Sequence, residues 1–145
     1  MSASSLIQTQ TALYYALTHD TPYVAACPSV YDAVPQTPTY PYTVIGDALE
    51  LSDRFMGQNA HEVLLLCSIY TRDGSTVKAG TGSKGFAAAL AIAQLQIDRL
   101  VEQNVLSVTG HAVAMIEIES VETFREDDGI TRRVDVRYRV LLEDA

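Results

Sequence analysis

The chain has 145 residues and a mass of 15.8 kDa, which fits one ordinary domain spanning residues 1–145. Its 48% hydrophobic and 19% charged residues are typical of a folded globular protein and exclude a disordered or fibrous chain. The net charge of −8 argues against a surface that binds nucleic acid phosphates, because such surfaces need clustered lysine and arginine.

We expect neither an export signal nor a membrane-spanning segment in this chain. Its first five residues lack the basic start and apolar run of a signal peptide, and no window approaches the ~20 apolar residues that span a bilayer. Cys27 and Cys67 form no CxxC pair, which predicts two free thiols rather than a disulfide or a zinc site.

Residues 4–19 are predicted to form the first helix, because three leucines recur on one side at near-helical spacing. They are Leu6, Leu13 and Leu17. The helix should end before Pro22, since proline disfavours the helical conformation in the residue before it. Residues 22–41 hold all five prolines and show no sustained period, which predicts an extended segment with a short strand at residues 30–34.

Residues 42–53 are predicted to form a strand, because apolar side chains alternate along them. One expected face carries Thr43, Ile45, Leu49 and Leu51. Gly46 marks an expected bulge or bend. The connection at residues 54–59 carries Phe55 and Met56, and exposed apolar side chains of this kind indicate a partner surface.

The strand predicted at residues 60–72 is apolar on both faces in its middle. One expected face carries His61, Val63, Leu65, Cys67 and Ile69, and the other carries Leu64, Leu66 and Tyr70. Such a strand is central in its sheet and is covered on both sides, either by a helix or by another subunit.

Residues 83–104 give the clearest helical pattern, with a core-facing stripe at steps of three and four and several alanines that favour helix. The stripe consists of Phe86, Leu90, Ala93, Ile97 and Leu100.

The last segment is predicted to be a long hairpin of residues 111–124 and 132–143, with a turn centred on Asp128. The expected apolar faces are Ala112, Ala114, Ile116 and Ile118 on the first strand, and Val134, Val136, Tyr138, Val140 and Leu142 on the second. The other face of the second strand carries Arg133, Asp135, Arg137 and Arg139. This register places Glu117 opposite Arg139, Glu119 opposite Arg137, Ile118 opposite Tyr138 and Ile116 opposite Val140.

The order of the elements is helix, two or three strands, helix, two strands. It predicts the α+β class, with an antiparallel β-sheet of four to five strands and two helices packed on one face.

Several residue patterns invite a chemical interpretation. Residues 80–85 match Gly-x-Gly-x-x-Gly, but a loop separates them from the preceding strand and Phe86 stands where a P-loop needs lysine, so a flexible helix start is favoured over a nucleotide site. Cys67 with His61 and His111 would form a nucleophilic set only with a third, orienting group, and none is present. We therefore expect no catalytic residues and no cofactor.

The acidic residues of the hairpin are the remaining candidates for a metal site. They are Glu117, Glu119, Glu122, Glu126, Asp127 and Asp128. Their spacing does not match an EF-hand loop, and strand alternation with turn propensity explains them, so we expect no metal. Tyr31, Tyr40 and Tyr42 resemble a base-stacking set, but few basic residues lie nearby, which favours a packing or subunit-contact role.

Two short motifs carry a family resemblance. Residues 30–36, Val-Tyr-Asp-Ala-Val-Pro-Gln, and residues 40–46, Tyr-Pro-Tyr-Thr-Val-Ile-Gly, resemble the signature of the tail-terminator, or tail-completion, family of long-tailed phages. The resemblance continues through Tyr70, where relatives often carry tryptophan, to the Asp-Gly turn and basic strand of residues 128–133. It covers nearly the whole chain, although residues 75–84 are longer and richer in glycine than in the family.

The resemblance implies a structural protein of the virion, made in the host cytoplasm, rather than an enzyme. Such proteins form a ring, commonly of six subunits, that caps the tail tube, stops its growth and docks the tail to the head connector. The implied partners are further copies of the chain, the tail-tube protein and the head-completion or connector protein, with phage DNA passing through the lumen.

Two sets of residues are assigned to these contacts. The expected subunit interface consists of Tyr40, Tyr42, Phe55, Met56, Leu64, Leu66 and Tyr70, because one subunit cannot bury these surfaces alone. Glu117 and Glu119 are expected to flank the channel and to repel DNA phosphates. The alternative is another neck or tail-tube subunit, such as a head-completion protein. A small cytosolic enzyme is the third class, and it would need a polar pocket that the sequence does not indicate.

Overall fold

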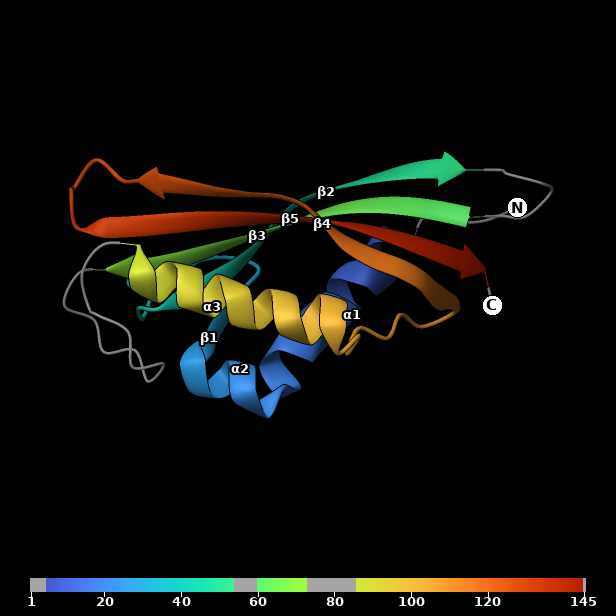
Figure 1. Ribbon diagram of the computed structural model, residues 1–145, viewed down its shortest axis with the longest axis horizontal. Coiled ribbons are helices and arrows are strands. Elements are labelled where there is room, and N and C mark those ends of the chain that lie inside the picture. Colours follow the sequence, from blue (N-terminus) through green and yellow to red (C-terminus); the bar gives the residue numbers. More distant parts are fainter. Residues whose placement is uncertain (1–4, 54–59, 73–85, 145) are drawn as a thin grey trace.

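The structure is a computed structural model that describes residues 5–53, 60–72 and 86–144. Five strands form one twisted sheet, and the helices lie together on one of its faces (Figure 1). The strands are β1 (Ser29–Tyr31), β2 (Tyr42–Asp53), β3 (Ala60–Arg72), β4 (His111–Arg125) and β5 (Thr131–Asp144). The helices are α1 (Leu6–His19), α2 (Thr21–Ala26), α3 (Ala87–Ile97) and the π-helical turn η2 (Asp98–Glu102).

The strand order is β1-β2-β3-β5-β4, and β3 is central as expected. The neighbours β2 with β3, β3 with β5 and β5 with β4 are antiparallel. The short edge strand β1 runs parallel to β2, with Ser29 opposite Tyr42. The α+β class is therefore confirmed, and the sheet is mostly but not wholly antiparallel.

Helix α1 is confirmed, but the prediction of an extended chain from residue 22 is wrong at its start. Pro22 lies in the first turn of α2, where a backbone N–H has no partner inside the helix and its loss costs nothing. The Asp20 carboxylate caps this helix by accepting from the backbone N–H of Tyr23 at 3.2 Å. The strand expected at residues 30–34 begins one residue earlier and ends at Tyr31.

Strand β2 has the predicted ends, but its two halves face differently. The pairing with β3 shifts between Ile45 and Ala48, next to Gly46, where a bulge was expected. After the shift Glu50 lies opposite the buried Val63, whereas Leu49 and Leu51 are 52% and 45% exposed on the other face. The prediction that these leucines share the face of Ile45 is wrong, because a bulge adds a residue and reverses the alternation.

Strand β3 follows the prediction along its whole length. All five residues expected on one face are buried beneath the helices: His61, Val63, Leu65, Cys67 and Ile69. On the other face Leu64 and Leu66 are half-buried, although none of the described helices packs there (Figure 1). This uncovered side is called the open face of the sheet below.

Helix α3 occupies the middle of the predicted helix and continues into η2, while residues 83–85 lie outside the described chain. Its core-facing stripe includes Ala93, Ile97 and Leu100 as expected, but Leu90 is 41% exposed. The buried face is rotated away from Leu90 because the inner positions are taken by small alanines and by Gln96, which is fully buried.

The hairpin of β4 and β5 confirms three of the four predicted cross-strand pairs. Glu117 lies opposite Arg139, Ile118 opposite Tyr138 and Ile116 opposite Val140. The predicted pair of Glu119 and Arg137 is wrong, because a register shift between Ile118 and Ser120 places Ser120 there. A second shift, between Val113 and Met115, also breaks the expected apolar face of residues 112–118, so only Ile116 is buried. All five apolar residues predicted for β5 are fully buried.

A chain of buried hydrogen bonds ties the helices to the sheet. The Tyr138 hydroxyl donates to Gln96 Oε1 at 2.7 Å, and Gln96 Nε2 donates to the Tyr23 hydroxyl at 2.9 Å. The chain continues from Tyr23 to the Thr43 hydroxyl at 2.5 Å and from Thr43 to the Cys27 thiol at 3.2 Å. It satisfies polar groups that would otherwise be costly to bury, and it links α2, β2, α3 and β5.

Candidate assembly surfaces

A cluster of tyrosines lies at one end of the sheet, where β2 begins and β3 ends. The rings of Tyr42 and Tyr70 stack with centroids 4.8 Å apart, and Tyr40 meets Tyr42 edge-on at 5.0 Å. Tyr31 adds a tilted contact to Tyr42 at 5.5 Å. The structure therefore brings together three predicted interface residues, Tyr40, Tyr42 and Tyr70, in packing that stabilises the sheet end.

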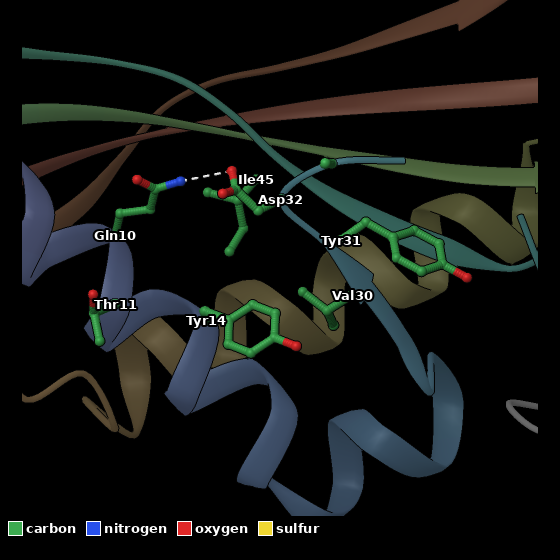
Figure 2. A pocket seen from close by; sticks show the side chains of 8 residues that line it. Gln10, Thr11, Tyr14, Val30, Tyr31, Asp32 and Ile45 are labelled. Atoms are coloured by element: carbon green, nitrogen blue, oxygen red, sulfur yellow. Dashed lines mark hydrogen bonds between the residues drawn. The ribbon is translucent and has the colours of Figure 1, made fainter. Parts of the chain in front are cut away.

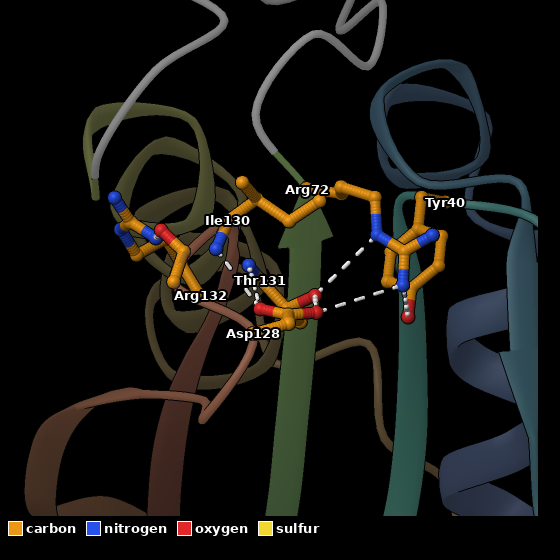
Figure 3. A network of polar contacts seen from close by, with 7 residues as sticks. Tyr40, Arg72, Asp128, Ile130, Thr131 and Arg132 are labelled. Atoms are coloured by element: carbon orange, nitrogen blue, oxygen red, sulfur yellow. Dashed lines mark hydrogen bonds and ion pairs between the residues drawn. The ribbon is translucent and has the colours of Figure 1, made fainter.

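Arg72, which the sequence analysis did not single out, joins this cluster to the hairpin turn (Figure 3). Its guanidinium carbon lies 4.3 Å from the centroid of the Tyr40 ring, and Nη2 donates to the Tyr40 hydroxyl at 3.1 Å. Nη2 is also 3.8 Å from Asp128 Oδ2, and Nε donates to the Thr131 hydroxyl at 3.4 Å. The stacking of an arginine on an aromatic ring is a specific contact. It could not be predicted from the sequence, because Tyr40 and Arg72 lie far apart in the chain.

The turn after β4 depends on Asp128. Its Oδ1 accepts from the backbone N–H groups of Ile130 at 2.9 Å and Thr131 at 2.8 Å, and Oδ2 accepts from the Thr131 hydroxyl at 2.6 Å. These hydrogen bonds, that of the Thr131 hydroxyl above all, lower the pKa of the Asp128 carboxyl below its usual value. Gly129 has φ of +75°, a conformation that favours glycine. The predicted turn is confirmed, and Asp128 is explained by local structure.

Four leucines gather on the β2 and β3 part of the open face, next to Glu62. The part formed by β2 and β3 carries Leu49, Leu51, Leu64 and Leu66, which we call the leucine band. Leu49 lies opposite Leu64 in the register. Two of the predicted interface residues, Leu64 and Leu66, are thus on this band, whereas Phe55 and Met56 lie outside the described residues.

The charged part of the open face is formed by β5 and β4. Arg139 is paired on both sides, with Nε 2.7 Å from Glu62 and Nη1 2.8 Å from Glu117. The predicted channel residues therefore differ: Glu117 is neutralised by a neighbour, and Glu119 is exposed at the register shift. Arg137 is exposed and has no ion-pair partner among the residues that the structure describes.

The hollows on the helix side lie on either side of α1. The larger, of about 480 Å³, is lined by Tyr14 and by the motif residues Val30, Tyr31 and Asp32 (Figure 2). The Gln10 amide donates to Asp32 Oδ1 at 2.7 Å on one side of this hollow. Its lining is formed by tyrosine, amide and apolar side chains with one carboxylate, Asp32.

The Cys-His set is not assembled. Cys67 and His61 lie six residues apart on β3, about 20 Å along the strand, and His61 is buried with Nδ1 3.0 Å from Glu50. His111 does lie near His61, with ring centroids 5.2 Å apart. Burial raises the pKa of Cys67 to about 12, so the thiol stays protonated and unreactive at neutral pH.

The described part of the chain contains neither a metal-binding cluster nor a membrane-spanning helix. Among residues 5–53, 60–72 and 86–144, no three His, Cys, Asp or Glu side chains gather where a metal ion could be held. Nor does any described helix have the length and apolar character needed to cross a membrane. Residues 80–85, with the Gly-x-Gly-x-x-Gly pattern, lie outside this part.

Comparison of the chain with known proteins identifies its family. The sequence profile of the family described as "Tail completion protein gp17" matches residues 11–143. A chain in the solved structure titled "Virion of native gene transfer agent (GTA) particle" has the same fold, with a TM-score of 0.75 and 24% identity over 98% of this chain and 99% of that one. No curated protein matches the sequence. The family profile spans nearly the whole chain, which therefore belongs to the tail completion protein gp17 family and is a structural tail or neck protein of the virion.

Proposed function

We propose that this chain is the tail terminator: copies of it form a ring, of six subunits, that caps the finished tail tube and ends its growth. The same ring joins the tail to the head-completion or connector protein. The observation that carries the proposal is the family match over residues 11–143. It is supported by the leucine band, an apolar part of the sheet that none of the described helices covers (Figure 1). A contact between two different surfaces can close copies into a ring.

The alternative is another neck or tail-tube subunit, such as a head-completion protein. Deleting the gene distinguishes these roles by electron microscopy of the particles. Loss of a terminator leaves tails of uncontrolled length that do not attach to heads. Loss of a head-completion protein leaves tails of normal length beside unjoined heads, and loss of a tube subunit leaves no tube. Tails of normal length in the deletion would contradict the terminator role.

The role that we propose for this chain is structural and involves no enzymatic activity. We assign Tyr40, Tyr42, Leu64, Leu66 and Tyr70 to structural contacts, within the chain and between copies. Phe55 and Met56 belong to the same proposed interface.

We further propose that Glu117 and Glu119 flank the channel and repel the DNA that passes through it. Because Arg139 already neutralises Glu117, most of the repulsion falls to Glu119. Changing both residues to lysine is expected to slow DNA ejection while rings still form. Glu102→Lys, at an exposed position on η2, is the matched control and should leave ejection unchanged. Normal ejection by the double variant would contradict this lining role.

A further inference from the structure

Helix α1 presents an unusual outer surface. Its 14 residues include no aspartate, glutamate, lysine or arginine, although the whole chain carries 28 such residues, 18 acidic and 10 basic. On its outer side Ile7 is 76% exposed, Tyr14 45% and Tyr15 62%. These three residues, which we call the α1 ridge, share one side of the helix at spacings of seven and eight.

The surroundings of the α1 ridge are shaped for a macromolecular contact. One hollow lies between Tyr14 and β1 (Figure 2), and a second, of about 400 Å³, lies between Ile7, Tyr15 and the segment of Ser107 and Thr109. An ordinary exposed helix carries charges on its outer side. A neutral, tyrosine-bearing ridge between two hollows instead matches the centre of a protein interface, where charges are depleted and tyrosine is enriched.

The same chain offers a complementary surface on its other layer. The leucine band on β2 and β3 is apolar, none of the described helices covers it, and the acidic Glu62 beside it is paired with Arg139 at 2.7 Å. The side chains that make up the ridge and the band are themselves all uncharged. They lie on opposite sides of the sheet (Figure 1), so one copy cannot bring them together and two copies can.

Charges beside the two surfaces are opposite in sign. The exposed Asp32 lies beside the α1 ridge, where it accepts from Gln10. The exposed Arg137 lies beside the leucine band, directly opposite Leu66 on the neighbouring strand. A contact that seats the ridge on the band can bring this acid and this base together at its rim, which favours one orientation.

We propose that the α1 ridge of one copy packs on the leucine band of the next copy, with Asp32 facing Arg137. This inference rests on the proposed ring, and it adds the surfaces that join neighbouring subunits. The contact uses two different surfaces, so it repeats head to tail and can close. It covers the β2 and β3 part of the open face and leaves the β4 part, with Glu119, free to flank the channel.

The decisive experiment is photo-crosslinking within the assembled ring. Tyr15 is replaced by p-benzoylphenylalanine, and labelled and unlabelled copies are mixed so that mass spectrometry identifies links between copies. The matched control places the same amino acid at Leu90, which is also exposed but lies on α3. We expect links from position 15 to residues 48–51 or 62–68 of another copy, and none to these residues from position 90.

A second measurement exchanges the rim charges. Asp32→Arg and Arg137→Asp are each expected to weaken association about tenfold, and the double variant should recover most of the loss. Sedimentation or native mass spectrometry of the rings provides the readout. No recovery in the double variant would overturn the contact as proposed.

The outcomes separate this inference from the proposed function. A ring that forms and caps tubes, but whose position 15 links to another protein or to other residues, would overturn the inference and leave the terminator role standing. If purified copies do not associate, the crosslinking is carried out on capped tails. A chain that forms no ring in either setting would contradict both.

Discussion

At the scale of single residues, Gln96 is the most consequential side chain that the sequence pattern did not indicate. A buried glutamine in an alanine-rich helix is expensive unless both ends of its amide are satisfied. Here one end accepts from Tyr138 and the other donates to Tyr23. The two tyrosines come from a helix and a strand that are remote in sequence, so no local pattern could have revealed the network.

Gln96→Leu is expected to lower the free energy of unfolding by about 2 kcal/mol, because it leaves the Tyr138 hydroxyl buried without its acceptor. Urea denaturation followed by circular dichroism measures the change. Tyr138→Phe alone should cost less, and adding it to Gln96→Leu should cost less than the sum, since the orphaned hydroxyl is then gone. Strict additivity would argue against this network.

The two thiols give a second prediction at this scale. Burial is the main cause that raises the pKa of Cys27, and it raises that of Cys67 to about 12. Both should therefore resist Ellman's reagent at about pH 8 in the native protein. They should react promptly in about 6 M guanidinium chloride, a concentration that unfolds even very stable domains. Fast labelling of Cys67 in the native protein would show that the thiolate is accessible, and would reopen a nucleophilic role.

At the scale of elements, the junction of α1, α2 and η2 depends on one ion pair. Asp20 caps α2 and also accepts from Arg99, with Nη2 to Oδ1 at 2.7 Å and Nε to Oδ1 at 2.8 Å. The Asp20 side chain is only 6% exposed, so its interactions are weakly screened by solvent. The π-helical turn that carries Arg99 is a deviation often found where a side chain must be re-aimed.

Asp20→Ala is expected to lower the free energy of unfolding by about 3 kcal/mol. It removes a helix cap and leaves the partly buried Arg99 guanidinium without its ion-pair partner. Asp20→Asn keeps an acceptor for the cap and should cost less. Thermal unfolding of the three proteins tests this order. Equal stability of the alanine and asparagine variants would show that the cap contributes nothing beyond the ion pair with Arg99.

The hairpin turn gives a prediction for pH. The folded-state pKa of Asp128 is lowered, so its stabilising effect is present above the usual carboxyl value of 3.8 and is lost as the pH falls through the lower folded value. The stability difference between the native chain and Asp128→Asn should therefore shrink on acidification from pH 6 toward about pH 3. A difference that stays constant over this range would contradict the role of the carboxylate.

The elements also show how far a single sequence can predict this fold. Strands β2 and β3 were located to the residue, because period-two alternation is a strong signal when one face is fully buried. The errors arose where one residue breaks the period: Leu49 after the bulge in β2, and Glu119 at the shift in β4. A bulge is set by pairing with the neighbouring strand, so the period of one strand does not encode it.

The candidate surfaces follow the same division. The open apolar side of β3 was predictable from Leu64 and Leu66, since their alternation does not depend on a partner. The α1 ridge was not predicted, because the spacing of apolar residues along a helix indicates only which side faces the core. Arg72 was not singled out and Arg137 was paired with the wrong residue, because the significance of each depends on which residues lie across the sheet.

At the scale of the whole molecule, folding and assembly should be separable. Leu49 is 52% exposed, so Leu49→Glu should change the stability of the single copy by no more than about 0.5 kcal/mol. The same change should abolish ring formation if the leucine band is a subunit contact, because it buries an unpaired charge. Leu90→Glu, at a comparable exposure on α3, is the matched control and should assemble normally. Intact rings from Leu49→Glu would exclude the band as an interface.

The contact of Arg72 with both Tyr40 and Asp128 has a consequence for how the family diverges. The Tyr-Pro-Tyr segment and the Asp-Gly turn look like independent landmarks in a linear comparison, yet one guanidinium holds them side by side. In a relative that has lost the arginine, we therefore expect both the Tyr-Pro-Tyr segment and the Asp-Gly turn to differ in sequence. Covariation of positions 40, 72 and 128 would then distinguish members that keep this clasp from those that brace the sheet end in another way.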